Sequence, residues 1–186
     1  AALLYRTRQD IAHRSIQLGS PWLADFASAR GGAYASQKQR FRGVNVTHTH
    51  HHLTGKQVYE GLAGFFIVED DDEIALQKAL DLKLGETDIP LMVHDRRIDA
   101  QGQIAFTPTD DEKADGFLGS QMLVNWTPKP YFEASTRVYR FRILNASNAR
   151  LYKLAFLNGK ESVAFQIIAN DGGLLASPQK ARECFL

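Results

Sequence analysis

Residues 138–144 constrain the fold most, because polar and apolar side chains alternate along them with a period of two. Aromatic and aliphatic residues fall in one register, and Arg140 and Arg142 fall in the other. Successive side chains of a strand point to opposite faces of a sheet, so this pattern predicts a strand with one mainly apolar face. The two arginines are expected to face outward, paired with nearby acids.

Other segments favour the same fold class. Residues 165–169 read as a further strand, which ends at the turn 170–173. Helical periodicity is scarce, and the best candidate is a helix over residues 72–84, whose acidic beginning suits the helix dipole. The acidic run 69–73 is expected to be a solvated charge run. Together these features predict an all-β chain built from antiparallel β-sandwiches.

Composition limits the remaining possibilities. The chain has 186 residues, 44% of them hydrophobic, which suits one domain or two small ones. No apolar run approaches the roughly 20 residues that span a bilayer, and the formal net charge of +1 gives no reason to expect a nucleic-acid partner. The single cysteine, Cys184, excludes an internal disulfide framework. Residues 1–42 hold seven Lys/Arg against two Asp/Glu and show weak periodicity, so their structure stays open.

Four histidines, at positions 48, 50, 51 and 52, lie within five residues. They follow an apolar, β-branched stretch that favours extended backbone. In a strand, His48, His50 and His52 would share one face while His51 would point to the other. The run therefore predicts a segment that presents two or three imidazoles to a metal, although a solvated histidine-rich loop that binds metal adventitiously is an alternative.

The sequence around this run resembles the multicopper oxidases, the family of laccases and copper-efflux oxidases. The histidine pair leads into Tyr59-Glu60-Gly61-Leu62-Ala63-Gly64, which resembles the family's Tyr-x-Gly-Leu-x-Gly stretch. Residues 88–97, 116–119, 139–150 and 170–175 resemble later blocks, and the blocks occur in the family's order from residue 48 to residue 178.

The resemblance implies a cupredoxin-like Greek-key β-sandwich, incomplete relative to the three-domain family. It divides the chain into a basic segment of unclear structure (1–42), the end of cupredoxin-like domain one (43–75), a linker (76–87) and part of cupredoxin-like domain two (88–186). Unpaired sheet edges left by missing parts would favour self-association.

The resemblance also implies the chemistry. His48 and His50 match ligands of the paired type 3 coppers in a trinuclear copper cluster, and His52 matches a further histidine found in many bacterial members. The family oxidises phenols, aromatic amines or cuprous ion and reduces dioxygen to water. The motif that binds the electron-entry copper is absent, so this chain alone is not expected to complete the cycle unless another chain supplies the missing ligands. Many members are periplasmic or secreted, but no signal peptide is visible here and the compartment stays open.

Two other interpretations remain open. The run partly resembles the metal motif of zinc-dependent metallo-β-lactamase-like hydrolases, but its aspartate is missing and His94 is the only later histidine. The chain could instead be a catalytically silent cupredoxin-like module that binds metal weakly or serves in an interaction. Within the multicopper oxidase resemblance, His94 is expected to be structural rather than metal-binding. Trp126 replaces a glycine common in the family's turn, so a distorted hairpin is expected there.

Overall fold

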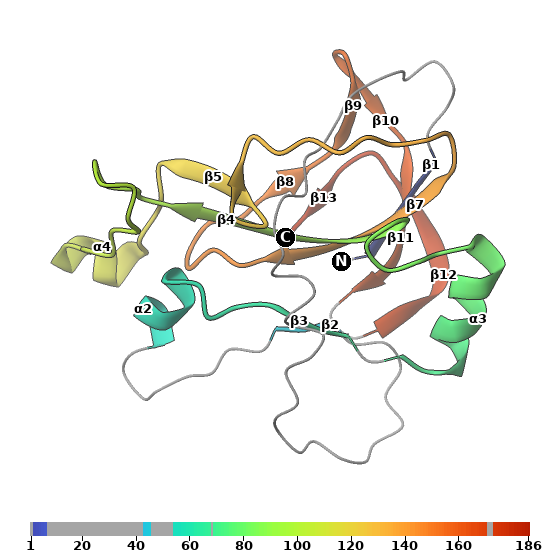
Figure 1. The fold of residues 1–186 in the computed structure, drawn as a ribbon, viewed down its shortest axis with the longest axis horizontal. Coiled ribbons are helices and arrows are strands. Elements are labelled where there is room, and N and C mark those ends of the chain that lie inside the picture. Colours follow the sequence, from blue (N-terminus) through green and yellow to red (C-terminus); the bar gives the residue numbers. More distant parts are fainter. Residues whose placement is uncertain (1, 7–42, 46–53, 68, 171–172) are drawn as a thin grey trace.

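The structure is a computed structural model that describes residues 2–6, 43–45, 54–67, 69–170 and 173–186. Strands predominate (Figure 1), which confirms the predicted all-β class. The strands are β1 (Ala2–Arg6), β2 (Gly43–Asn45), β3 (Phe65–Ile67), β4 (Asp88–Arg96), β5 (Gln121–Val124), β6 (Thr127–Pro128), β7 (Val138–Asn145), β8 (Lys153–Leu154), β9 (Phe156–Asn158), β10 (Glu161–Val163), β11 (Phe165–Asn170), β12 (Gly173–Ala181) and β13 (Cys184–Phe185). The helices are α2 (Thr54–Tyr59), α3 (Asp71–Leu80) and α4 (Asp110–Asp115).

A seven-stranded sheet with the order β12-β11-β1-β7-β4-β5-β6 organises the described residues. Its neighbouring strands are antiparallel except for β4 and β7, which run parallel with Asp88 opposite Arg140 and Val93 opposite Asn145. Antiparallel pairing, as expected from the sequence, thus prevails in this sheet, and the parallel pair β4–β7 at its centre is the exception. Three two-stranded sheets, β10-β9, β13-β8 and β2-β3, accompany it.

The structure contains strands at the positions that the sequence indicated. The strand predicted over 138–144 is β7, the block 88–97 contains β4, and the strand predicted over 165–169 is β11. β1 was not foreseen, because the basic segment that contains it shows weak periodicity. It pairs with both β7 and β11 and so lies inside the sheet.

Helix α3 confirms the predicted helix but ends earlier than residue 84. The carboxylate of Asp70 caps its beginning by accepting a hydrogen bond from the Glu73 amide at 2.9 Å. Asp81 ends it in the left-handed region, at φ 49°. Residues 76–80 of the segment expected to be a linker are therefore helical. No helix in the described ranges is long and apolar enough to cross a bilayer.

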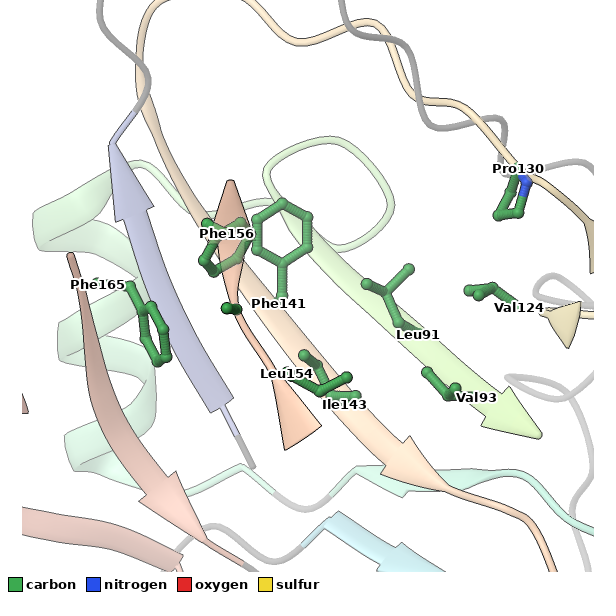
Figure 2. A pocket seen from close by; sticks show the side chains of 10 residues that line it. Leu91, Val93, Val124, Pro130, Phe141, Ile143, Leu154, Phe156 and Phe165 are labelled. Carbon is green, nitrogen blue, oxygen red and sulfur yellow. The ribbon is translucent and has the colours of Figure 1, made fainter. Parts of the chain in front are cut away.

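The apolar core lies on one face of the sheet. Ile89, Tyr139, Phe141, Ile143 and Phe165 are buried together there. Against the same face lies an apolar pocket of about 270 Å³, to which β4, β7 and β11 contribute side chains (Figure 2). The pocket is lined by Leu91, Val93, Val124, Pro130, Phe141, Ile143, Leu154, Ala155, Phe156 and Phe165.

Candidate functional site

The candidate metal ligands His48, His50 and His52 lie outside the described residues. The prediction that they share one strand face therefore stays a prediction. The structure does describe both flanks of the run. β2 ends at Asn45 and pairs with β3, and α2 begins at Thr54.

The chain that follows the run packs against the sheet. Tyr59, the last residue of α2, is fully buried, and its hydroxyl accepts a hydrogen bond from the Arg97 amide at 2.6 Å. Its ring meets Phe106 and Phe117 with centroid distances of 5.0 and 4.9 Å. Farther along, Ala63 packs with buried Met92 of β4. The Tyr-x-Gly-Leu-x-Gly stretch is thus the point where the segment after the histidines attaches to the sheet.

Trp126 forms part of this attachment. It lies in the two-residue turn between β5 and β6, with φ values of 48° at Asn125 and 65° at Trp126. The strands pair regularly on both sides of the turn, so the expected distortion is not found. Left-handed backbone is unfavourable for tryptophan, but the ring gains contacts in return. It covers Gly61, where an added Cβ would lie 2.9 Å from the indole.

His94 is buried on the same side as this segment. Its ring meets that of Trp126 edge-on with a centroid distance of 4.3 Å. Burial, and then the nearby Arg96 charge, lowers the pKa of His94 from 6.5 to about 3, so the ring is neutral at physiological pH. Neither ring nitrogen finds a hydrogen-bond partner in the described part of the chain. The same part contains no group of three or more His, Cys, Asp and Glu that would hold a metal. The burial of the ring and its packing against Trp126 support a structural role for His94.

Arg140 and Arg142 are buried, which corrects the expectation that they face outward. They form one ion-pair cluster with Glu73 of α3 and Asp88 of β4, and all four side chains are at most 3% exposed. Arg142 Nη2 lies 2.8 Å from both Glu73 Oε1 and Asp88 Oδ2. The expected pairing with acids is correct, but α3 covers this face of the sheet.

The acidic run at 69–73 is corrected in the same way, because its last member, Glu73, is fully buried. Burial alone would raise the pKa of Glu73, but hydrogen bonds and the charge of Arg140 lower it below its usual value. Asp71 and Asp72 are exposed, as a solvated run requires. The local sequence could not show which acid would turn inward, because that depends on the docking of α3.

A second ion pair, between Asp95 and Arg150, lies beside the segment that follows α4. Asp95 of β4 is buried, and its Oδ2 accepts hydrogen bonds from Arg150 Nε at 2.7 Å and from the Gly119 amide at 2.6 Å. Gly119 lies directly against the β4 backbone, since an added Cβ would be 2.3 Å from the Arg96 nitrogen. Sequence reasoning assigned Asp95 no such role. The matching family block around Gly116-Phe117-Leu118-Gly119 was the available signal.

Cys184 is a buried free thiol on β13, and burial raises its pKa above the usual value. It packs with the apolar core beside Phe141 and Phe165. The Cys184 side chain therefore contributes to the packing of the apolar core.

The donor chemistry of the run fits copper. Neutral imidazole nitrogen is a ligand that copper binds well, and four imidazoles occur within five residues. This fit rests on the chemistry of the imidazole nitrogen alone, because the four histidines lie outside the described residues.

Comparison with known proteins identifies relatives over most of the chain, although no family model matches. A laccase of Bacillus stratosphericus is 42% identical over an alignment of 137 residues, with 68% of this chain and 26% of that protein covered. The cell division protein FtsP of Proteus mirabilis is 39% identical over an alignment of 153 residues, with 79% of this chain and 30% of that protein covered. The chain thus spans less than a third of the length of these relatives.

Solved structures share the fold. The McoA multicopper oxidase of Aquifex aeolicus matches with a TM-score of 0.72 and 35% identity, covering 100% of this chain and 40% of that one. A laccase from Pediococcus acidilactici matches with a TM-score of 0.69 and 30% identity, covering 82% of this chain and 31% of that one. These matches confirm a cupredoxin-like fold that is incomplete relative to the full-length proteins. Shared sequence blocks and shared fold together show that the chain belongs to the multicopper oxidase family.

Proposed function

We propose that this chain forms part of a laccase-like multicopper oxidase and supplies His48 and His50, with His52 beside them, as copper ligands. The observation that carries the proposal is the dense histidine run, followed directly by a family-like segment that docks on the sheet through Tyr59. The relatives named laccase and multicopper oxidase support the same assignment.

The proposed reaction takes electrons from phenols, aromatic amines or cuprous ion and reduces dioxygen to water. Bound copper would supply the one-electron redox chemistry. The part of this chain is to donate imidazole nitrogens, with His48 and His50 as ligands of a type 3 pair. The remaining ligands of a trinuclear cluster would come from outside these 186 residues.

A second candidate is a catalytically silent cupredoxin-like module. It is favoured by the relatives named cell division protein FtsP, which are as similar to this chain as the laccase is. The histidine run distinguishes the two candidates, because only the oxidase needs it to bind copper. The comparisons do not favour the zinc hydrolase interpretation, since the relatives reported above are laccases, multicopper oxidases and FtsP.

Metal competition followed by an activity assay tests the proposal. The purified protein is equilibrated with equal concentrations of copper and zinc, and the metals retained after desalting are counted per chain. Dioxygen uptake with a phenol and ester hydrolysis are then measured on the same sample. Copper retained by the wild type but lost by the double variant His48→Ala with His50→Ala supports the proposal, with or without dioxygen uptake, since the missing ligands limit turnover. Retained zinc with hydrolysis would favour the hydrolase, and retention of neither metal would favour the silent module.

A further inference from the structure

Arg96, the last residue of β4, is a fully buried cation with no carboxylate ion pair among the described residues. In contrast, Arg140 in the same sheet is held by Glu73 and Asp88. Burial lowers the pKa of Arg96 below its usual value. A buried charge without a counter-ion is unfavourable unless other groups replace its hydration shell. The groups that contact the Arg96 guanidinium therefore indicate which parts of the chain this residue connects.

The partners of Arg96 come from two parts of the chain. Nη1 donates to the Asp95 carbonyl at 2.7 Å within β4, and Nη2 donates to the Val58 carbonyl at 3.0 Å in α2. The guanidinium carbon lies 4.6 Å from the ring centroid of Tyr59 and 5.3 Å from that of Trp126. Carbonyl dipoles and aromatic faces both stabilise a cation. Arg96 therefore ties the end of α2 to the sheet and to the β5–β6 turn.

Other contacts fix the same segment at other points. The Asn148 side chain donates to the Gly55 carbonyl at 2.8 Å, near the start of α2. The Trp126 ring covers Gly61 so closely that no side chain fits there. These contacts act on residues 54–64, and Thr54 lies two positions after His52.

We propose that Arg96 is a positioning residue that locks residues 54–64 onto the sheet and so fixes the chain leaving the histidine run. The consequence for copper rests on the proposed function, but the locking of the segment does not. A methionine at position 96 would fill similar space without donors or charge, so the segment would lose its link from Val58 to β4. A lysine would keep the charge but not the fork of donors that reaches two carbonyls.

Hydrogen exchange read by mass spectrometry tests the locking directly. In Arg96→Met, the amides of residues 60–63, which bond within this segment, should exchange about tenfold faster or more, the effect expected for one lost hydrogen bond from a charged donor. The amides of β7 and β11 should exchange as in the wild type. Arg97→Met is the matched control, because the side chain of Arg97 binds the Leu118 carbonyl and Glu112 instead.

Two further variants keep the test decisive if Arg96→Met does not fold. Asn148→Ala removes a second side-chain hydrogen bond to the segment, the one to the Gly55 carbonyl, and should raise exchange near the start of α2 by a smaller factor. Arg96→Lys should give an intermediate effect at residues 60–63. Unchanged exchange at residues 60–63 in folded Arg96→Met, or in Arg96→Lys if only that variant folds, would overturn the proposal.

Copper titration of the same variants tests the consequence for the run. Arg96→Met should bind copper about tenfold more weakly than the wild type, whereas Arg97→Met should match the wild type. Faster exchange at residues 60–63 with unchanged copper affinity would refute positioning of the run. Failure of the wild-type chain to bind copper would refute the proposed function and this consequence, while the exchange result would still decide whether Arg96 locks the segment.

Discussion

His94 illustrates how one buried side chain can tie the stability of this protein to pH. Its imidazole is fully buried against Trp126, and its pKa falls to about 3 in the fold, compared with 6.5 for an ordinary histidine. Between these two values the unfolded chain binds a proton that the folded chain does not. Stability is therefore unaffected above about pH 6.5, declines as the pH falls below it, and levels off near pH 3.

We predict that His94→Leu removes most of this pH dependence. The expected loss in the wild type approaches the order of 4 kcal/mol by pH 3, from about 1.4 kcal/mol for each pKa unit. Leucine has a similar size and no nitrogens that need partners, so the variant should be at least as stable as the wild type at pH 7 and more stable at pH 4. Urea unfolding at both pH values measures this. An equal loss of stability between pH 7 and pH 4 in both proteins would contradict the account of His94.

At the scale of secondary structure, the ion-pair cluster holds α3 to the sheet. Glu73 from the helix and Asp88 from β4 together meet Arg140 and Arg142 of β7 without access to solvent. Removing one member of such a cluster leaves a buried charge uncompensated, which typically destabilises a protein by about 3–5 kcal/mol.

Glu73→Ala should therefore lower the free energy of unfolding by about 3–5 kcal/mol. Asp72→Ala is the control on the same helix, since Asp72 is exposed, and it should change stability little. Chemical denaturation monitored by circular dichroism gives both values. Similar unfolding midpoints for the two variants would show that the cluster does not stabilise the docking of α3.

The strands and the helix that could be predicted from the sequence are those whose own residues carry a characteristic pattern. Alternation identified β7, and β-branched residues before a turn identified β11. The acidic start of α3 was predicted from the sequence one residue late, at Asp72, and its cap at Asp70 was not identified. The burial of Arg140 could not be predicted from the sequence, because a charged residue on an alternating strand faces solvent unless a helix covers that face of the sheet. The histidine run was recognisable as a candidate site from its density alone, whereas the contacts of Arg96 join positions far apart in sequence and required the fold.

At the scale of the whole molecule, the seven-stranded sheet ends in an edge strand with which a strand of a second chain could pair. β12 is nine residues long and ends the sheet on one side, and its residues from Ala176 to Lys180 are exposed. Pro178 has no backbone N–H, so this edge lacks a donor at that position. The apolar pocket beside Phe141 adds surface that a second chain could cover (Figure 2).

We predict that the isolated chain self-associates as its concentration rises. A charge on the edge strand should oppose this association, so Ser177→Lys should shift it to higher concentration. Light scattering over a dilution series compares the two proteins. A wild-type chain that remains monomeric at every concentration would contradict this prediction.

The ratio of copper to protein in purified samples tests the central claim most directly. The wild type and His51→Ala should each retain copper after desalting, because His51 is predicted to point away from the site. The double variant His48→Ala with His50→Ala should retain almost none. Equal copper in the double variant and the wild type would contradict the claim that these two imidazoles bind the metal.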